Sequence, residues 1–196
     1  MRFLFVFLII SSFSNLATAQ EVLREQNNFP LSFSIQFQSF GLPFKNLRHS
    51  FKNVGIGLGT EFKWGEDGAT VQQFKLVRYF NQTMGNGWVA STHFAWRPIP
   101  EDTFQPEINL GLAWHYVARP STAFKLEKGS WLQEGRKGKG MLSVPIGLGF
   151  GYLEEGKEWN PYLNYQMLLS SGYSETIPVV PYHFMELGLR KFSLED

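Results

Sequence analysis

Nine ionisable side chains lie at the polar positions of segments in which polar and apolar residues alternate. They are Glu61, Lys63, Lys75, His93, Arg97, Glu107, His115, Glu186 and Arg190. Inside a narrow fold, acids and bases of this kind form a hydrogen-bonded network of ion pairs. We therefore expect Arg97 and Glu107, which end and begin neighbouring antiparallel strands, to lie at similar height. A proton or ion path is a second interpretation of the same residues.

Period-two alternation of apolar and polar residues recurs eight times and is typical of β-strands with two different faces. Phe, Leu, Ile and Trp fill one face, whereas Ser, Gln, Gly, Asn and charged residues fill the other. The segments are 31–38, 54–62, 70–80, 88–96, 107–116, 142–152, 161–169 and 182–192. Their lengths suit tilted transmembrane β-strands, which need about 9–11 residues.

The connections between these segments differ in length. Residues 65–68 form a tight Gly-Glu-Asp-Gly turn, whereas 39–51, 119–140 and 172–181 are longer. If the first strand starts at the periplasmic side, the three longest connections all face outward. Short periplasmic turns and longer outer loops are typical of outer-membrane barrels. The connection at 97–106 is of intermediate length.

The composition is rich in Phe and Gly and low in charge. Of 196 residues, 43% are hydrophobic and 18% charged, with 19 Phe and 19 Gly, and the mean hydropathy is −0.18. The absence of cysteine excludes disulfides, thiolate metal sites and a lipid-anchored lipoprotein. The four histidines have no metal-ligand spacing, and no basic excess indicates nucleic acid as a partner. We expect no cofactor.

The first residues have the form of a secretory signal peptide. Arg2 is followed by an apolar run over 3–10 and by the small residues Ala17-Thr18-Ala19. This run is too short for a membrane-spanning helix. We predict cleavage before Gln20, which divides the chain into a signal peptide, an N-terminal lead, a β-barrel and a tail. Their ranges are 1–19, 20–29, 30–192 and 193–196.

Alternation alone fits two kinds of barrel. A soluble lipocalin-like barrel holds its apolar side chains inside around an apolar ligand, whereas a membrane barrel turns them outward. The glycines at 55, 57 and 59 and at 147, 149 and 151 are poor residues for an exposed strand. They favour a narrow interior in which small residues leave room for larger partners.

With these features the chain resembles the small eight-stranded outer-membrane β-barrels of Gram-negative bacteria, of the OmpX, OmpW and OmpA-transmembrane-domain type. The resemblance covers nearly all of residues 30–192 and includes the last strand, 182–192. It implies an all-β, antiparallel up-and-down transmembrane barrel that the barrel-assembly machinery inserts into the outer membrane. Such proteins commonly end in an aromatic residue, whereas here Phe192 is followed by Ser193-Leu194-Glu195-Asp196.

In such a barrel, aromatic side chains form girdles at the two membrane interfaces. We expect Trp64, Tyr152 and Trp159 at the periplasmic girdle and Phe80, Trp114, Tyr116 and Tyr182 at the outer one. Trp88 and Trp96 share one face of a strand, eight residues apart, so that strand can place one Trp near each interface.

Basic residues gather in the predicted outer part of the chain. The stretch 119–140 holds six basic residues and two acidic ones, and Arg78 interrupts an apolar face near the outer end of its strand. Guanidinium and ammonium groups there could bind lipopolysaccharide phosphates, or the stretch could be a solvated loop. The candidate contacts are Arg78, Arg136, Lys137 and Lys139.

An enzyme that modifies lipid A, a deacylase or acyltransferase, is an alternative within the same architecture. Acyl transfer requires a nucleophilic Ser, a His base and an orienting group. Deacylases of this kind carry a late His-x-Ser pair, but His183 is followed by Phe184 and Met185. His49 and Ser50 are adjacent, yet neighbouring side chains on a strand point apart. We therefore predict a structural or surface-interaction role, with an unknown ligand for the outer loops.

Overall fold

The computed structural model describes the parts of the chain that form the predicted strands and most of their connections. The described residues are 30–39, 51–64, 68–99, 103–118, 120, 122–127, 129–135, 138–154, 157–173 and 177–191. The predicted signal peptide, N-terminal lead and C-terminal tail lie outside them, as do His49 and Ser50. No helix within these ranges is both long and apolar enough to cross a membrane.

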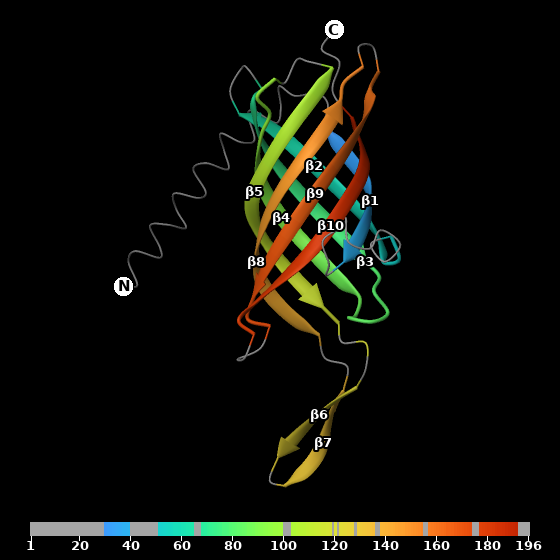
Figure 1. Ribbon diagram of the computed structural model, residues 1–196, viewed down its shortest axis with the longest axis vertical. Coiled ribbons are helices and arrows are strands. Elements are labelled where there is room, and N and C mark those ends of the chain that lie inside the picture. The colour runs from blue at the N-terminus through green and yellow to red at the C-terminus, as the bar shows by residue number, and fades with distance from the viewer. Residues whose placement is uncertain are drawn as a thin grey trace, which may run out of the picture.

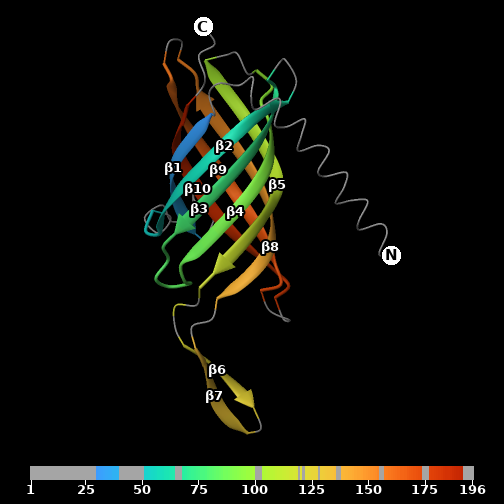
Figure 2. The ribbon, with the colours of Figure 1, turned by 180° about the vertical axis from the view of Figure 1, so that it is seen from behind.

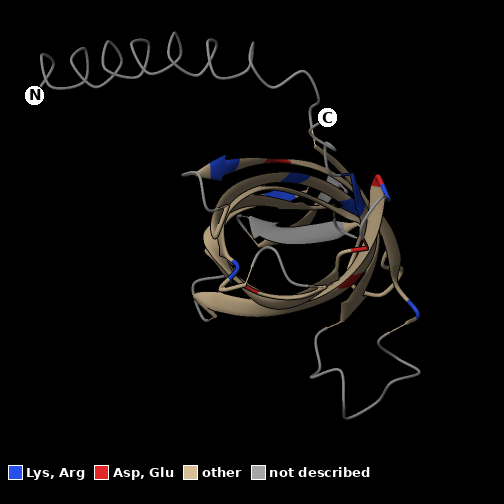
Figure 3. Ribbon diagram, turned by 90° about the horizontal axis from the view of Figure 1, so that it is seen from above, with Lys and Arg blue, Asp and Glu red and all other residues tan. Residues whose placement is uncertain are grey.

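Eight antiparallel strands form a closed barrel (Figure 1), which confirms the fold class predicted from the sequence. The barrel strands are β1 (Leu31–Ser39), β2 (Val54–Trp64), β3 (Thr70–Tyr79), β4 (Gly87–Trp96), β5 (Phe104–Val117), β8 (Lys139–Tyr152), β9 (Trp159–Ser171) and β10 (Val179–Lys191). Each pairs with its neighbours along the chain, and β1 also pairs with β10. Viewed along the barrel axis, the strands form a ring (Figure 3).

The register sets which residues face inward. Ser34 of β1 lies opposite Gly57 of β2 and Gly188 of β10, so that small polar-face residues meet across three strands. The outward residues match in the same way, since Ile35 lies opposite Ile56 and Leu187. Side chains alternate along each strand, and the two faces predicted from the sequence therefore continue around the wall.

The two ends of the barrel differ. At one end, which we call the turn end, residues 65–69, 97–103 and 153–158 connect the strands. At the opposite end, the loop end, the connection between β5 and β8 forms a separate hairpin of β6 (Ala123–Glu127) and β7 (Ser130–Gly135). This hairpin extends beyond the barrel (Figures 1 and 2). The sequence pattern predicted only a loop here.

Candidate functional site

The outer wall of the barrel is apolar and exposed. Every barrel strand contributes large apolar side chains to it, among them Phe33, Ile56, Leu76, Phe94, Leu110, Leu148, Leu163 and Leu187. A continuous apolar band of this kind is not found on the surface of soluble monomers, where exposed apolar patches are small. The wall is therefore suited to contact lipid.

Aromatic side chains lie outward at both ends of this apolar wall. At the turn end the structure places Trp64, Trp96, Tyr152 and Trp159, and at the loop end it places Phe80, Trp88, Trp114 and Tyr116. The expectation for Tyr182 is wrong, because this residue is buried inside the barrel. It lies on the inward face of β10, as does Glu186 four residues further along the strand.

Four charged side chains meet inside the barrel near the turn end. Arg97 Nη2 lies 2.7 Å from Glu61 Oε2, and Arg97 Nε lies 2.9 Å from Glu107 Oε2. Arg190 approaches the same two acids, at 3.3 Å from Glu61 and 3.1 Å from Glu107. Gln73 donates a further hydrogen bond of 3.2 Å to Glu107. Each guanidinium thus bridges both carboxylates, and all four groups are buried.

A second ion pair lies deeper in the lumen. Lys75 Nζ is 3.0 Å from Glu186 Oε2, and the hydroxyl of Tyr162 donates a 2.6 Å hydrogen bond to Glu186 Oε1. Asn164 donates to the same carboxylate and accepts a hydrogen bond from Asn109. A buried charge is tolerated only when it is paired and hydrogen-bonded, and this carboxylate meets that condition.

The buried charges balance. Three acids, Glu61, Glu107 and Glu186, contact three bases, Lys75, Arg97 and Arg190. Lys63 does not join them, because its side chain is exposed at the turn end of β2. The expectation that Lys63 lies in the lumen is therefore wrong. The strand parity of Lys63 is inward, but it lies one residue from the end of β2, where the lumen opens.

The half of the lumen toward the loop end is mainly apolar. A buried cluster fills it with Val77, Tyr79, Val89, Ala113, Val117, Met141, Leu168, Tyr182 and Phe184. The prediction of a polar lumen therefore holds only in part for this half, where Gln38, Asn81 and His115 are buried beside the apolar cluster. The inward positions of β10 and β3 near the loop end carry large apolar residues, and packing them together excludes water.

His115 lies within this apolar half and is held by hydrogen bonds. Its Nε2 is 2.7 Å from the hydroxyl of Tyr79, and its Nδ1 is 3.0 Å from Ser170 Oγ. Ser143 donates a 2.8 Å hydrogen bond to Ser170. The ring of Tyr182 covers the imidazole edge-on, at 4.5 Å between centroids. These contacts satisfy a buried imidazole, and the burial of Ser170 leaves a substrate no access to its hydroxyl.

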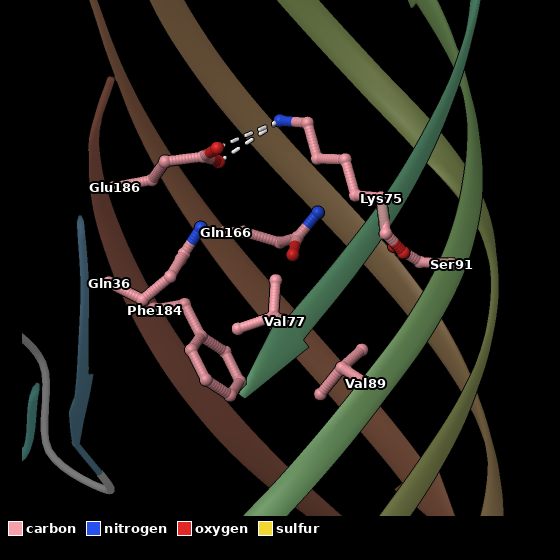
Figure 4. A pocket seen from close by; sticks show the side chains of 8 residues that line it. All are labelled: Gln36, Lys75, Val77, Val89, Ser91, Gln166, Phe184 and Glu186. Atoms are coloured by element: carbon pink, nitrogen blue, oxygen red, sulfur yellow. Dashed lines mark hydrogen bonds and ion pairs between the residues drawn. The ribbon is translucent and has the colours of Figure 1, made fainter. Parts of the chain in front are cut away.

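His93, the other predicted lumen histidine, lies nearer the middle of the barrel, where its Nε2 is 3.0 Å from Gln166 Nε2. A cavity of about 10 Å³ lies at the boundary between the polar and apolar halves. Lys75, Gln166 and Glu186 line its polar side, and Val77, Val89 and Phe184 line its apolar side (Figure 4). It is about large enough for one water molecule.

A metal centre would need several ligand side chains close together. Within the described ranges, no three His, Cys, Asp or Glu side chains are grouped as metal ligands. Several interior residues were not among the predicted site residues, among them Gln73, Tyr79, Tyr162, Asn164 and Ser170. Strand parity places all five on inward positions, so the alternation could have found them.

Two of the four residues predicted to contact phosphate, Arg78 and Lys139, lie within the described residues. Arg78 lies outward near the loop end of β3, where its guanidinium contacts the rings of Phe80 and Trp88. Lys139 is exposed and donates a 2.8 Å hydrogen bond to the carbonyl of Tyr173. Arg136 and Lys137 lie outside the described residues. The structure therefore shows the surroundings of Arg78 and Lys139 alone.

A closed eight-stranded antiparallel barrel is the fold of the small outer-membrane β-barrels. Neisserial surface protein A has this fold, with a TM-score of 0.58 and 11% identity, and the match covers 83% of this chain and 96% of that one. The N-terminal barrel domain of Pseudomonas aeruginosa OprF matches with a TM-score of 0.51 and 12% identity, over 82% and 96%.

At these identities the likeness concerns the fold. No protein-family model matches the chain, and no curated protein matches it in sequence. Function therefore has to be inferred from the geometry of the barrel itself.

Proposed function

We infer that this protein is an integral outer-membrane protein of a Gram-negative bacterium, with a sealed lumen and a surface-interaction element at its loop end. The observation that carries this proposal is that the barrel is apolar outside and charged inside, the reverse of a soluble protein. Leucine and phenylalanine side chains face outward, whereas six ion-paired charges lie inside. Closure of the barrel also leaves no unpaired strand edge, as a membrane requires.

The same distribution of polarity disfavours a soluble barrel that carries an apolar ligand. Such a ligand occupies a pocket of about 300–1,000 Å³ lined mainly by apolar groups. The cavity between Lys75 and Phe184 measures about 10 Å³ and is half polar. The packed cluster around Leu168 closes the loop half of the lumen. We therefore propose that the barrel is an anchor and conducts no ions.

The β6–β7 hairpin is the described element at the loop end that is best suited to bind a partner. Trp131 is 70% exposed and Leu132 is 52% exposed. Among the described strands, β6 and β7 pair only with each other, and the hairpin extends past the barrel (Figure 1). Exposed Trp is enriched at protein–protein contacts. We propose that this hairpin faces the outside of the cell and binds the unknown ligand of the outer loops.

The proposal is tested on cells that produce the full chain. We expect the protein in the outer-membrane fraction, and we expect its migration on a gel to change on heating as the barrel unfolds. Reconstituted in planar bilayers, it should show no conductance above background. Recovery from the soluble periplasm would refute the membrane location. Conductance well above background would refute the sealed lumen.

A further inference from the structure

Arg78 is a charged residue on the apolar outer wall. It lies directly opposite Trp88 in the pairing of β3 with β4. Its guanidinium carbon lies 4.7 Å from the centroid of the Trp88 ring and 5.4 Å from that of Phe80. Two aromatic faces therefore hold the cation at one height on the wall. Such contacts fix its position by cation–π attraction.

The guanidinium donors of Arg78 have no acceptor in the part of the chain that the structure describes. Each of the three cations in the lumen contacts a carboxylate, but no described carboxylate forms an ion pair with Arg78. Contact with an aromatic ring leaves the N–H groups at the edge of a guanidinium free. A guanidinium presents five such donors in a fork that matches the oxygens of a phosphate.

The position of Arg78 along the barrel agrees with the level of lipid headgroups. It lies one residue from the loop end of β3, at the height of the exposed aromatic residues Trp88 and Tyr116. Aromatic residues of this kind mark the interface of a membrane. Lys52 is exposed just before β2, the strand next to β3. It adds a second positive charge to this end of the wall.

We propose that Arg78, Phe80 and Trp88 form a binding site for a phosphate group of lipid A in the outer leaflet. The guanidinium binds two phosphate oxygens, and the two rings hold it in place and contact the sugar and upper acyl chains. The inference depends on the proposed outer-membrane location, since only there does the loop end face a phosphorylated glycolipid.

Binding of lipid A to the folded full-length protein in detergent tests the site. We compare diphosphorylated lipid A with chemically dephosphorylated lipid A by native mass spectrometry. Arg78→Gln should weaken binding of the diphosphorylated form at least about tenfold, because it removes the charge-assisted hydrogen bonds to the phosphate oxygens. It should leave binding of the dephosphorylated form unchanged. Arg78→Lys should lose part of the affinity, because an ammonium keeps the charge but not the bidentate geometry.

Lys157→Gln is the matched control, because it removes an exposed cation at the turn end. It should bind both forms as the wild type does. Equal binding by the wild type and Arg78→Gln would overturn the proposal. So would wild-type affinity that is the same for phosphatidylglycerol as for lipid A. Both measurements use only protein whose gel migration changes on heating, which shows that the barrel is folded. A negative binding result is therefore distinct from a failure of the proposed membrane location.

Discussion

Lys75 on β3 and Glu186 on β10 form an ion pair of 3.0 Å across the lumen, although β2 and β1 separate their strands around the wall. The side chains of this pair are 8% and 4% exposed. The Tyr162 hydroxyl and the Asn164 amide complete the hydrogen bonding of the carboxylate. The pair therefore ties together two parts of the wall that share no backbone hydrogen bonds.

Replacing one partner of this pair should be costly. Lys75→Met leaves the Glu186 carboxylate buried without a cation, so we expect the free energy of unfolding to fall by about 3–5 kcal/mol. The double variant Lys75→Met/Glu186→Gln should recover most of that loss. Urea unfolding in lipid vesicles, followed by tryptophan fluorescence, measures both.

Lys157→Met provides the comparison, because it breaks an exposed pair with Glu154. Its cost should stay below about 1 kcal/mol. A loss for Lys75→Met that is no larger than the loss for Lys157→Met would show that the lumen pair is solvated.

Two outward residues of β5 test whether the wall contacts lipid. Leu110 lies in the middle of the strand, and Phe104 lies at its turn end. Leu110→Arg should destabilise the vesicle-embedded protein by about 2–4 kcal/mol, and Phe104→Arg by about 0–1 kcal/mol, because the cost of a charge depends on its depth in the bilayer. Equilibrium unfolding in vesicles gives both values. Equal effects at the two positions would contradict a membrane-embedded wall.

The interior glycines differ in the space around them. A Cβ at Gly111 would overlap the Thr92 carbonyl oxygen and come within 2.8 Å of the Cα of His93, so the backbone would have to shift. A Cβ at Gly151 would lie at an ordinary 3.5 Å from Gln105. We expect Gly111→Ala to lower the free energy of unfolding by about 1–3 kcal/mol. Gly151→Ala should be close to neutral, and comparable losses in both would show that strand flexibility matters more than space.

The β6–β7 hairpin should be dispensable for folding. Its strands pair only with each other. Replacement of residues 123–135 by a short Gly-Ser linker should therefore change the free energy of unfolding by less than about 0.5 kcal/mol, with heat-modifiable migration retained. The Trp131→Ser/Leu132→Ser variant should fold as well as the wild type. Cells that produce this variant should no longer attach to surfaces that bind cells producing the wild type. Full attachment by this variant would assign the interaction to another loop.

The alternation of polar and apolar residues was sufficient to predict the eight strands and the direction of most side chains. A strand whose two faces meet different surroundings requires such an alternation. The same rule predicted that all nine ionisable residues face inward, and the structure places eight of them in the lumen, but the rule could not locate the end of the lumen. Lys63 keeps inward parity and is nevertheless exposed.

Composition was a weaker guide than parity to the inside of the barrel. Tyr182 was expected at an interface because it is aromatic, but its parity on β10 directs it inward beside the His115 ring. Val77, Tyr79 and Phe184 also lie on inward positions, and only the closed barrel brings them together into one apolar cluster. The hairpin was missed because its short strands follow one another within a basic, glycine-containing stretch.

Two ion pairs of the lumen connect residues far apart in the sequence, 111 positions for Lys75 and Glu186 and 83 for Arg190 and Glu107. While the sheet is still open, Lys75, Glu186 and Arg190 have none of these partners and keep their hydration shells. An unclosed assembly intermediate therefore carries a hydrated surface along one side that resists transfer into the bilayer. Pairing of β1 with β10 removes this water and brings Glu186 to Lys75, and Arg190 to Glu61 and Glu107, in one step. We expect insertion and closure to be coupled, so that partly closed barrels do not accumulate in the membrane.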